Sequence, residues 1–103
     1  MDDDPAAGYR YRDWAPLVGQ SVAAELPGGE RIELELAEAN EFDGPGEQFS
    51  LVFRAQAGPP FLEQRSYPVG HPELGEVLLF LVPIDPRGDV GQVLEALINR
   101  PEG

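Results

Sequence analysis

The sequence predicts a mainly β protein, a single small antiparallel β-barrel or sandwich of about six strands with a short helical turn near its N-terminus. Short segments in which apolar and polar residues alternate recur along the chain, and turns rich in Pro and Gly separate them. This pattern is typical of sandwiches and barrels. The longest apolar run, residues 77–82, has the length of a buried strand and is far shorter than a membrane span of about 20 residues.

The length of the chain limits its organisation. Its 103 residues suffice for one domain with one core. We assign residues 9–100 to that domain, between a disordered acidic tail at 1–8 and a short tail at 101–103. The N-terminus lacks the apolar segment of a secretory signal, so we expect a cytoplasmic protein.

The composition excludes several classes of function. The net charge of −12 makes nucleic acid and anionic membranes poor partners, because phosphate binding needs a basic surface. The absence of cysteine excludes disulfides, thiol catalysis and cysteine-based zinc sites. The partner expected on this basis is another protein or a second copy of the chain.

One helical turn is predicted just after the N-terminal tail. Asp13 is a favoured N-cap, and Gly19 suits the C-terminal end of the turn. Trp14, Leu17 and Val18 would then share one face. We expect this apolar face to pack on the barrel.

Alternation predicts the strands that follow. Residues 20–26 and 32–36 form a hairpin around a Pro-Gly-Gly turn, and residues 40–46 are expected to be loop. A further strand covers residues 48–54. A weaker strand covers 61–69, where Pro68 indicates a sheet edge or the end of the strand. The predicted core consists of Val22, Ile32, Leu34, Leu36, Phe49, Leu51, Phe53, Val69, Leu79 and Leu81.

The central run is unusual because both of its faces are apolar. One face carries Val77, Leu79 and Leu81, and the other carries Leu78, Phe80 and Val82. A barrel with one core buries only one of these faces. The second face therefore needs a cover, which is either the helical turn, the C-terminal segment through Val93 and Leu97, or a protein partner. Leu78, Phe80 and Val82 are the candidate partner-facing residues.

No constellation of catalytic or metal-binding residues stands out. His71 is the only histidine and lies in a His-Pro turn, where a surface or turn role is expected. Acidic residues gather at 40–43 and 85–89, but neither segment has the spacing of a calcium-binding loop. No serine lies in a Gly-x-Ser-x-Gly motif, and no Gly-rich phosphate loop is present. We therefore expect no enzyme, no cofactor and no metal.

Several segments together resemble a known family. The Phe-Ser-Leu-Val-Phe-Arg segment at 49–54 and the Leu-Phe-Leu-Val-Pro segment at 79–83 are the most specific. From about Trp14 to Asn99 the chain is similar to the DUF6916-type small bacterial domains, which have no established activity. The resemblance implies an assembly or accessory role near phage-tail-like proteins.

The C-terminal segment has two readings. The pattern of residues 90–99 alone favours an amphipathic helix, but Leu94, Ala96 and Ile98 also alternate as in a strand. The resemblance implies a strand at 92–99, which would pair beside the central run. The expected function is a non-catalytic structural or adaptor domain of a larger bacterial assembly. The alternative is a small-ligand-binding or hydrolytic β-barrel domain.

Overall fold

The computed structural model describes residues 10–43, 47–56, 61–85 and 91–100. The tails expected at 1–8 and 101–103 lie outside these residues. The elements are α1 (Tyr11–Trp14), the 3-10 helix η1 (Ala15–Leu17), β1 (Ser21–Glu25), β2 (Arg31–Phe42), β3 (Glu47–Ala55), β4 (Arg65–His71), β5 (Gly75–Asp85) and β6 (Val93–Arg100). No helix in this part of the chain is long and apolar enough to cross a membrane.

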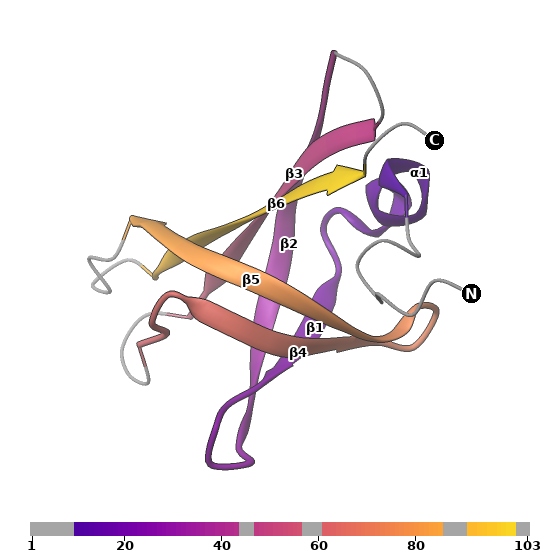
Figure 1. Cartoon of the computed structure of the whole chain (residues 1–103). Coiled ribbons are helices and arrows are strands. Elements are labelled where there is room, and N and C mark those ends of the chain that lie inside the picture. Colours follow the sequence, from indigo (N-terminus) through magenta and orange to yellow (C-terminus); the bar gives the residue numbers. More distant parts are fainter. Residues whose placement is uncertain (1–9, 44–46, 57–60, 86–90, 101–103) are drawn as a thin grey trace.

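The six strands form one closed barrel, in the order β1-β2-β3-β6-β5-β4 (Figure 1). Every neighbouring pair is antiparallel. The predicted fold class is therefore confirmed, and the sheet takes the barrel form of the two that the sequence allowed. Closure gives each strand a neighbour on both sides over part of its length, although the β1–β4 and β5–β6 junctions are paired at only two and three positions.

The predicted hairpin is the first part of the barrel. β1 and β2 pair so that Val22 lies opposite Leu34 and Ala24 lies opposite Ile32. Directly opposed side chains point to the same face of an antiparallel pair. The apolar residues of both strands therefore face the interior together.

β2 is longer than expected and changes phase along its length. The loop expected at 40–46 is wrong in its first part, because β2 continues to Phe42. The register with β3 shifts between Leu36 and Glu38, which is a β-bulge. After the bulge Ala39 faces inward opposite Leu51, whereas Phe42 is left 46% exposed.

β4 is shorter than expected at its start and longer at its end. It begins at Arg65 rather than at residue 61, and Phe61 is 56% exposed. The alternative in which the strand ends at Pro68 is wrong, since β4 continues to His71. Pro68 pairs with Leu78 of β5, and the register with β1 includes only Val69 and its neighbour Gly70. Pro68, which has no backbone N–H to donate, therefore lies where β4 is paired with β5 but not with β1.

The C-terminal segment is a strand. β6 covers Val93–Arg100 and lies between β3 and β5, so the strand expected at 92–99 is confirmed and the helical alternative is wrong. Leu94, Ala96 and Ile98 are buried, and Leu97 is exposed. Pairing with two neighbouring strands stabilises this conformation over the helix that the spacing also permits.

The helical turn starts earlier than predicted. Asp13 is not the N-cap of α1, because the helix begins at Tyr11 after the N-cap Arg10. Instead the Asp13 carboxylate accepts a hydrogen bond of 2.8 Å from the backbone N–H of Arg10. A short acidic side chain three residues into a helix can satisfy a free N–H group in this way.

The interior of the barrel is close to that predicted. Nine of the ten predicted core residues are buried, and Ile32 is partly buried against the core. The core also includes residues that the alternation did not assign to it: Trp14, Leu17, Ala24, Ala55, Leu62, Tyr67, Val77, Leu94, Ala96 and Ile98. Apolar burial of this extent is the main favourable term in the stability of such a barrel.

Candidate interaction surface

The outer face of β5 carries an apolar strip, which we define as Leu78, Phe80 and Val82. Leu78 is 49% exposed and Phe80 is 50% exposed, and Val82 is half-buried. The alternate residues of the same strand are buried in the core. Side chains of a strand point to opposite faces in turn, so a continuous apolar sequence must present one row outward.

The helical turn does not cover the β5 strip, which corrects one of our expectations. Trp14 and Leu17 belong to the buried core, and Val18 is 42% exposed. The Tyr11 ring meets the edge of Phe49 at a centroid distance of 6.0 Å. The turn therefore packs against the barrel interior near β2 and β3, and its apolar residues extend the core.

The C-terminal segment does not cover the strip either. Leu97 points outward from β6 and is 70% exposed. Val93 lies opposite Asp85, at the other end of the β5–β6 pairing. No described residue of either expected cover therefore buries Leu78 or Phe80.

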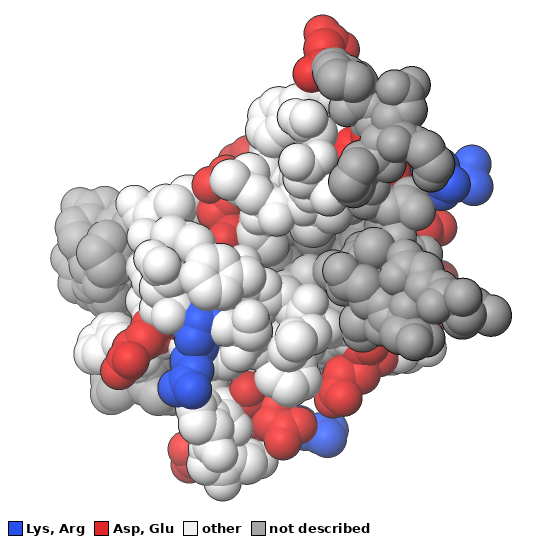
Figure 2. Space-filling model, viewed as in Figure 1, with Lys and Arg blue, Asp and Glu red and all other residues white. Residues whose placement is uncertain are grey.

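The surroundings of the strip combine apolar and acidic groups. Pro68 lies opposite Leu78, and Ser66 lies opposite Phe80. Glu95 lies opposite Val82, and Glu76 is the next outward residue beyond Leu78. Figure 2 shows uncharged side chains over most of the centre of this view, where β4, β5 and β6 lie, with acidic side chains at its borders and a basic side chain left of the centre.

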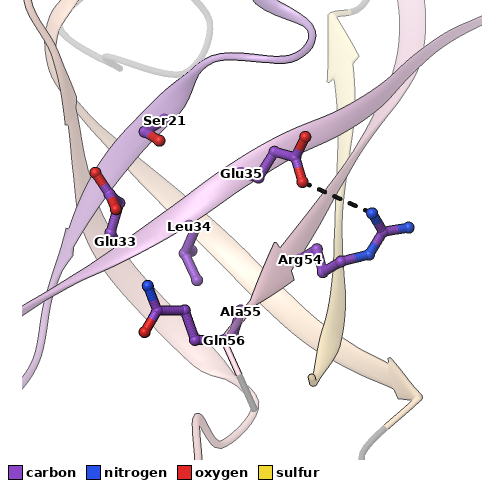
Figure 3. Close-up of a pocket in the computed structure, with 7 residues that line it drawn as sticks. All are labelled: Ser21, Glu33, Leu34, Glu35, Arg54, Ala55 and Gln56. Carbon is purple, nitrogen blue, oxygen red and sulfur yellow. Dashed lines mark ion pairs between the residues drawn. The ribbon is translucent and has the colours of Figure 1, made fainter. Parts of the chain in front are cut away.

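A second candidate site is an open pocket of about 290 Å³ on the outside of β1, β2 and β3. Its lining consists of Ser21, Glu33, Leu34, Glu35, Arg54, Ala55 and Gln56. Ser21, Glu35 and Arg54 lie in one row because they are opposed across the three strands. Figure 3 shows Arg54 reaching toward Glu35, and the two form an ion pair at 3.6 Å. Both side chains are about half exposed, so water weakens this pair.

Comparison with known proteins identifies the family of this barrel. The family described as a domain of unknown function (DUF6916) matches residues 9–98. The chain belongs to this family. The match extends from the N-terminal turn into β6, so it includes the β5 strip and the open pocket. No curated protein and no solved structure matches the chain.

The single histidine of this DUF6916 domain has a structural position. His71 is 8% exposed, more buried than expected for a surface turn. Its Nδ1 accepts a 3.0 Å hydrogen bond from the backbone N–H of Glu73. Nε2 therefore carries the proton and donates to Oε1 of Gln20 at 2.9 Å. These bonds fix the β4–β5 turn to the segment before β1 and occupy both ring nitrogens.

The acidic segments do not assemble a metal site in the part of the DUF6916 domain that the structure describes. No group of three or more His, Asp and Glu side chains there could hold a metal ion. Asn40 instead donates to Glu38 at 3.3 Å along β2. Most of the acidic segment at 85–89 lies outside the described residues.

Two features of the candidate sites were not predicted. Leu97 was expected to provide a cover, but it adds to the exposed apolar surface. The ion pair of Glu35 with Arg54 depends on the β2–β3 register, and no local sequence signal fixes that register.

Proposed function

We propose that this DUF6916 domain is a non-catalytic structural or adaptor domain, which docks on a protein partner in a larger bacterial assembly of the phage-tail-like kind. The observation that supports this proposal is the exposure of Leu78 and Phe80 in one continuous row on β5. Contiguous exposed apolar side chains commonly mark protein–protein interfaces. Each is already about half buried, so burying the remainder on a partner contributes about 0.8–1.5 kcal/mol.

Charge favours a different protein over a second copy of the chain as the partner. Each chain carries a net charge of −12, so two copies repel each other. Glu76 and Glu95 border the β5 strip. A partner with an apolar centre and a basic rim would complement both features.

The test is a charge placed on the strip. The full chain is co-expressed with the proteins encoded by its neighbouring genes, and complexes are isolated by size-exclusion chromatography. Phe80→Glu should abolish the complex while the melting temperature of the isolated chain changes little, because Phe80 is already 50% exposed. The matched control is Phe42→Glu, which changes an equally exposed phenylalanine near the end of β2.

Three results would contradict the proposal. The first is that Phe80→Glu forms the complex as well as wild type does. The second is that Phe80→Glu and the control Phe42→Glu lose the complex equally. The third is that the wild type forms no complex with any neighbouring gene product. Neighbouring genes for sheath, tube or collar proteins would support the phage-tail-like role, and their absence would count against it.

The open pocket supports a second candidate function, the binding of a small polar ligand. Arg54 and Ser21 offer donors there, and Glu33 offers an acceptor. Hydrolysis has less support, because activating Ser21 needs a neighbouring base and both His71 nitrogens are already bonded. A thermal-shift screen of small carboxylates and phosphates tests ligand binding. A stabilising compound should lose its effect in Arg54→Ala and keep it in Arg31→Ala.

A further inference from the structure

The barrel is only partly paired between β1 and β4, where the register holds two pairs, and it also opens between β5 and β6. The two strands are paired at Val82 with Glu95, at Pro83 with Leu94, and at Asp85 with Val93. Beyond Val82 the register has no further pairs, although β5 continues back to residue 75 and β6 continues to residue 100. Figure 1 shows the two strands diverging from this point in a V. We call the arms of the V, residues 76–81 and 96–100, the seam.

Each arm of the seam is paired on one side. Residues 76–81 pair with β4, and residues 96–100 pair with β3. Across the V, no described residue pairs with either arm. Within the described part of the chain, each arm therefore has an edge at which alternate backbone N–H and C=O groups are not paired with another strand.

The interior behind the seam is filled. Leu79, Leu81 and Ala96 point inward from the two arms and are at most 2% exposed. Trp14 belongs to the same core and is equally buried. The open feature is thus a backbone edge and not a hole into the core. On the outside, Leu78, Phe80 and Leu97 flank it and are about half exposed or more.

We propose that β5 accepts an extended segment of a protein partner as an added strand along residues 76–81. This inference rests on the proposed function, and it specifies how the partner docks. Strand addition combines backbone hydrogen bonds with contacts to alternate side chains. A segment paired with this edge would place every second side chain beside Leu78 and Phe80.

The chemistry of the seam defines the segment. Its outward positions should carry large apolar residues, which complete the surface begun by Phe80 and Leu97. Its ends should carry basic residues, because Glu76 and Glu95 border the strip and the whole chain is strongly acidic. We therefore infer a basic, extended polypeptide with alternating apolar residues.

The experiment uses the full chain and a synthetic peptide of about six alternating isoleucine and threonine residues with arginine at both ends. Binding is measured by titration, and amide hydrogen exchange is followed by NMR. At a peptide concentration about ten times the dissociation constant, exchange of seam amides should slow about tenfold. Amides of the β1–β2 hairpin serve as the internal reference and should not change.

Two control peptides separate strand addition from side-chain docking. A peptide with alternate backbone amides N-methylated keeps its side chains but cannot complete the ladder, and it should not bind. A peptide with glutamate at both ends should bind at least about tenfold more weakly. The double variant Glu76→Arg and Glu95→Arg should weaken binding of the arginine peptide similarly, whereas Glu33→Arg on β2 should not.

The outcomes distinguish this inference from the proposed function. Equal binding of the methylated and unmethylated peptides overturns strand addition but leaves docking on the β5 strip intact. Failure of the unmethylated peptide to bind also overturns it, even if Phe80→Glu still disrupts a partner complex. Protection of the seam amides in the absence of peptide would also overturn strand addition by a partner. Protection that rises with protein concentration would indicate that a second copy occupies the seam. Protection that is lost when residues 1–9 are removed would indicate that the chain's own N-terminus occupies it.

Discussion

The side chain of Gln92 makes two hydrogen bonds with the backbone of Leu62, its Nε2 donating to the carbonyl and its Oε1 accepting from the N–H, each at 2.8 Å. Both residues are buried, with Gln92 4% exposed. The side-chain amide of Gln92 thus satisfies the backbone N–H and C=O of Leu62, as a neighbouring strand would, in the segment that precedes β4. The backbone carbonyl of Gln92 also accepts a 2.8 Å hydrogen bond from Ala55, so this residue links three parts of the chain.

Replacing Gln92 should therefore be costly. In Gln92→Ala the buried N–H and C=O of Leu62 lose their partners, and we expect a loss of about 2–5 kcal/mol in the free energy of unfolding. Urea denaturation measures this loss. Gln64→Ala, at an exposed position, is the control and should lie within about 0.5 kcal/mol of wild type. Equal stability of the two variants would contradict the structural role of Gln92.

Tyr67 should make stability depend on alkaline pH. Burial of the phenol raises the pKa of Tyr67 above its ordinary value of 10.0, and this effect exceeds the lowering by its hydrogen bond with Glu63. The folded chain then holds this proton more tightly than the unfolded chain. The contribution is complete below about pH 10 and is lost as the pH rises through the folded pKa.

Tyr67→Phe tests this dependence. The hydroxyl donates to the Glu63 carbonyl at 2.7 Å and accepts from the Glu63 N–H at 3.0 Å, so the variant should lose about 1–3 kcal/mol at neutral pH. It should also lose less stability than wild type between about pH 9 and pH 11. Denaturant midpoints across this range provide the measurement. Tyr11→Phe retains Tyr67, so its stability should fall with pH as steeply as that of wild type. An equally steep fall in Tyr67→Phe would contradict the role of the Tyr67 hydroxyl.

Gly19 allows the chain to turn from η1 into the barrel. Its φ is +93°, a backbone conformation that L side chains rarely adopt, and its N–H donates to the Leu36 carbonyl at 2.8 Å. Gly19→Ala should cost about 1–2 kcal/mol although the new methyl group meets no atom within 4 Å. Gly28→Ala has equal space and no positive φ, so it should be neutral or slightly stabilising. Thermal unfolding of both variants distinguishes backbone strain from packing.

Adjacent leucines of β5 should differ greatly in their contribution to stability. Leu79 is 2% exposed and Leu78 is 49% exposed. Leu79→Ala should cost about 2–5 kcal/mol, because it opens a cavity in the core. Leu78→Ala should cost less than about 1 kcal/mol in the isolated chain. Chemical denaturation decides this, and a large loss in Leu78→Ala would show that the strip is covered within the chain.

We expect stability to be independent of divalent metal. The chain has no cysteine and one histidine, and the ring nitrogens of that histidine are bonded to Gln20 and Glu73. Melting temperatures with and without EDTA should agree. A drop of more than a few degrees in EDTA would reveal a metal site that contributes to folding.

The facing of most strand residues could be predicted from the sequence. Phe49, Leu51 and Phe53 are all buried, as their alternation indicated. This works because side-chain direction in a strand is a local property with a period of two. Local information was insufficient where the period breaks, as at the bulge of β2. It was also insufficient in β6, where the local pattern favoured a helix and the structure has a strand.

The candidate surface was predicted in part for the same reason. Local alternation placed Leu78 and Phe80 on one face of their strand and required that something else cover them. What covers them is a question about distant segments, and the barrel decided that Trp14 extends the core while Leu97 stays exposed. The seam likewise follows from the register that closes β5 against β6. Such contacts join residues far apart in the sequence, so their geometry exists only once the barrel closes. The sequence by itself determined the strands and the row of apolar side chains on β5, and the tertiary structure decided which of those side chains remain accessible.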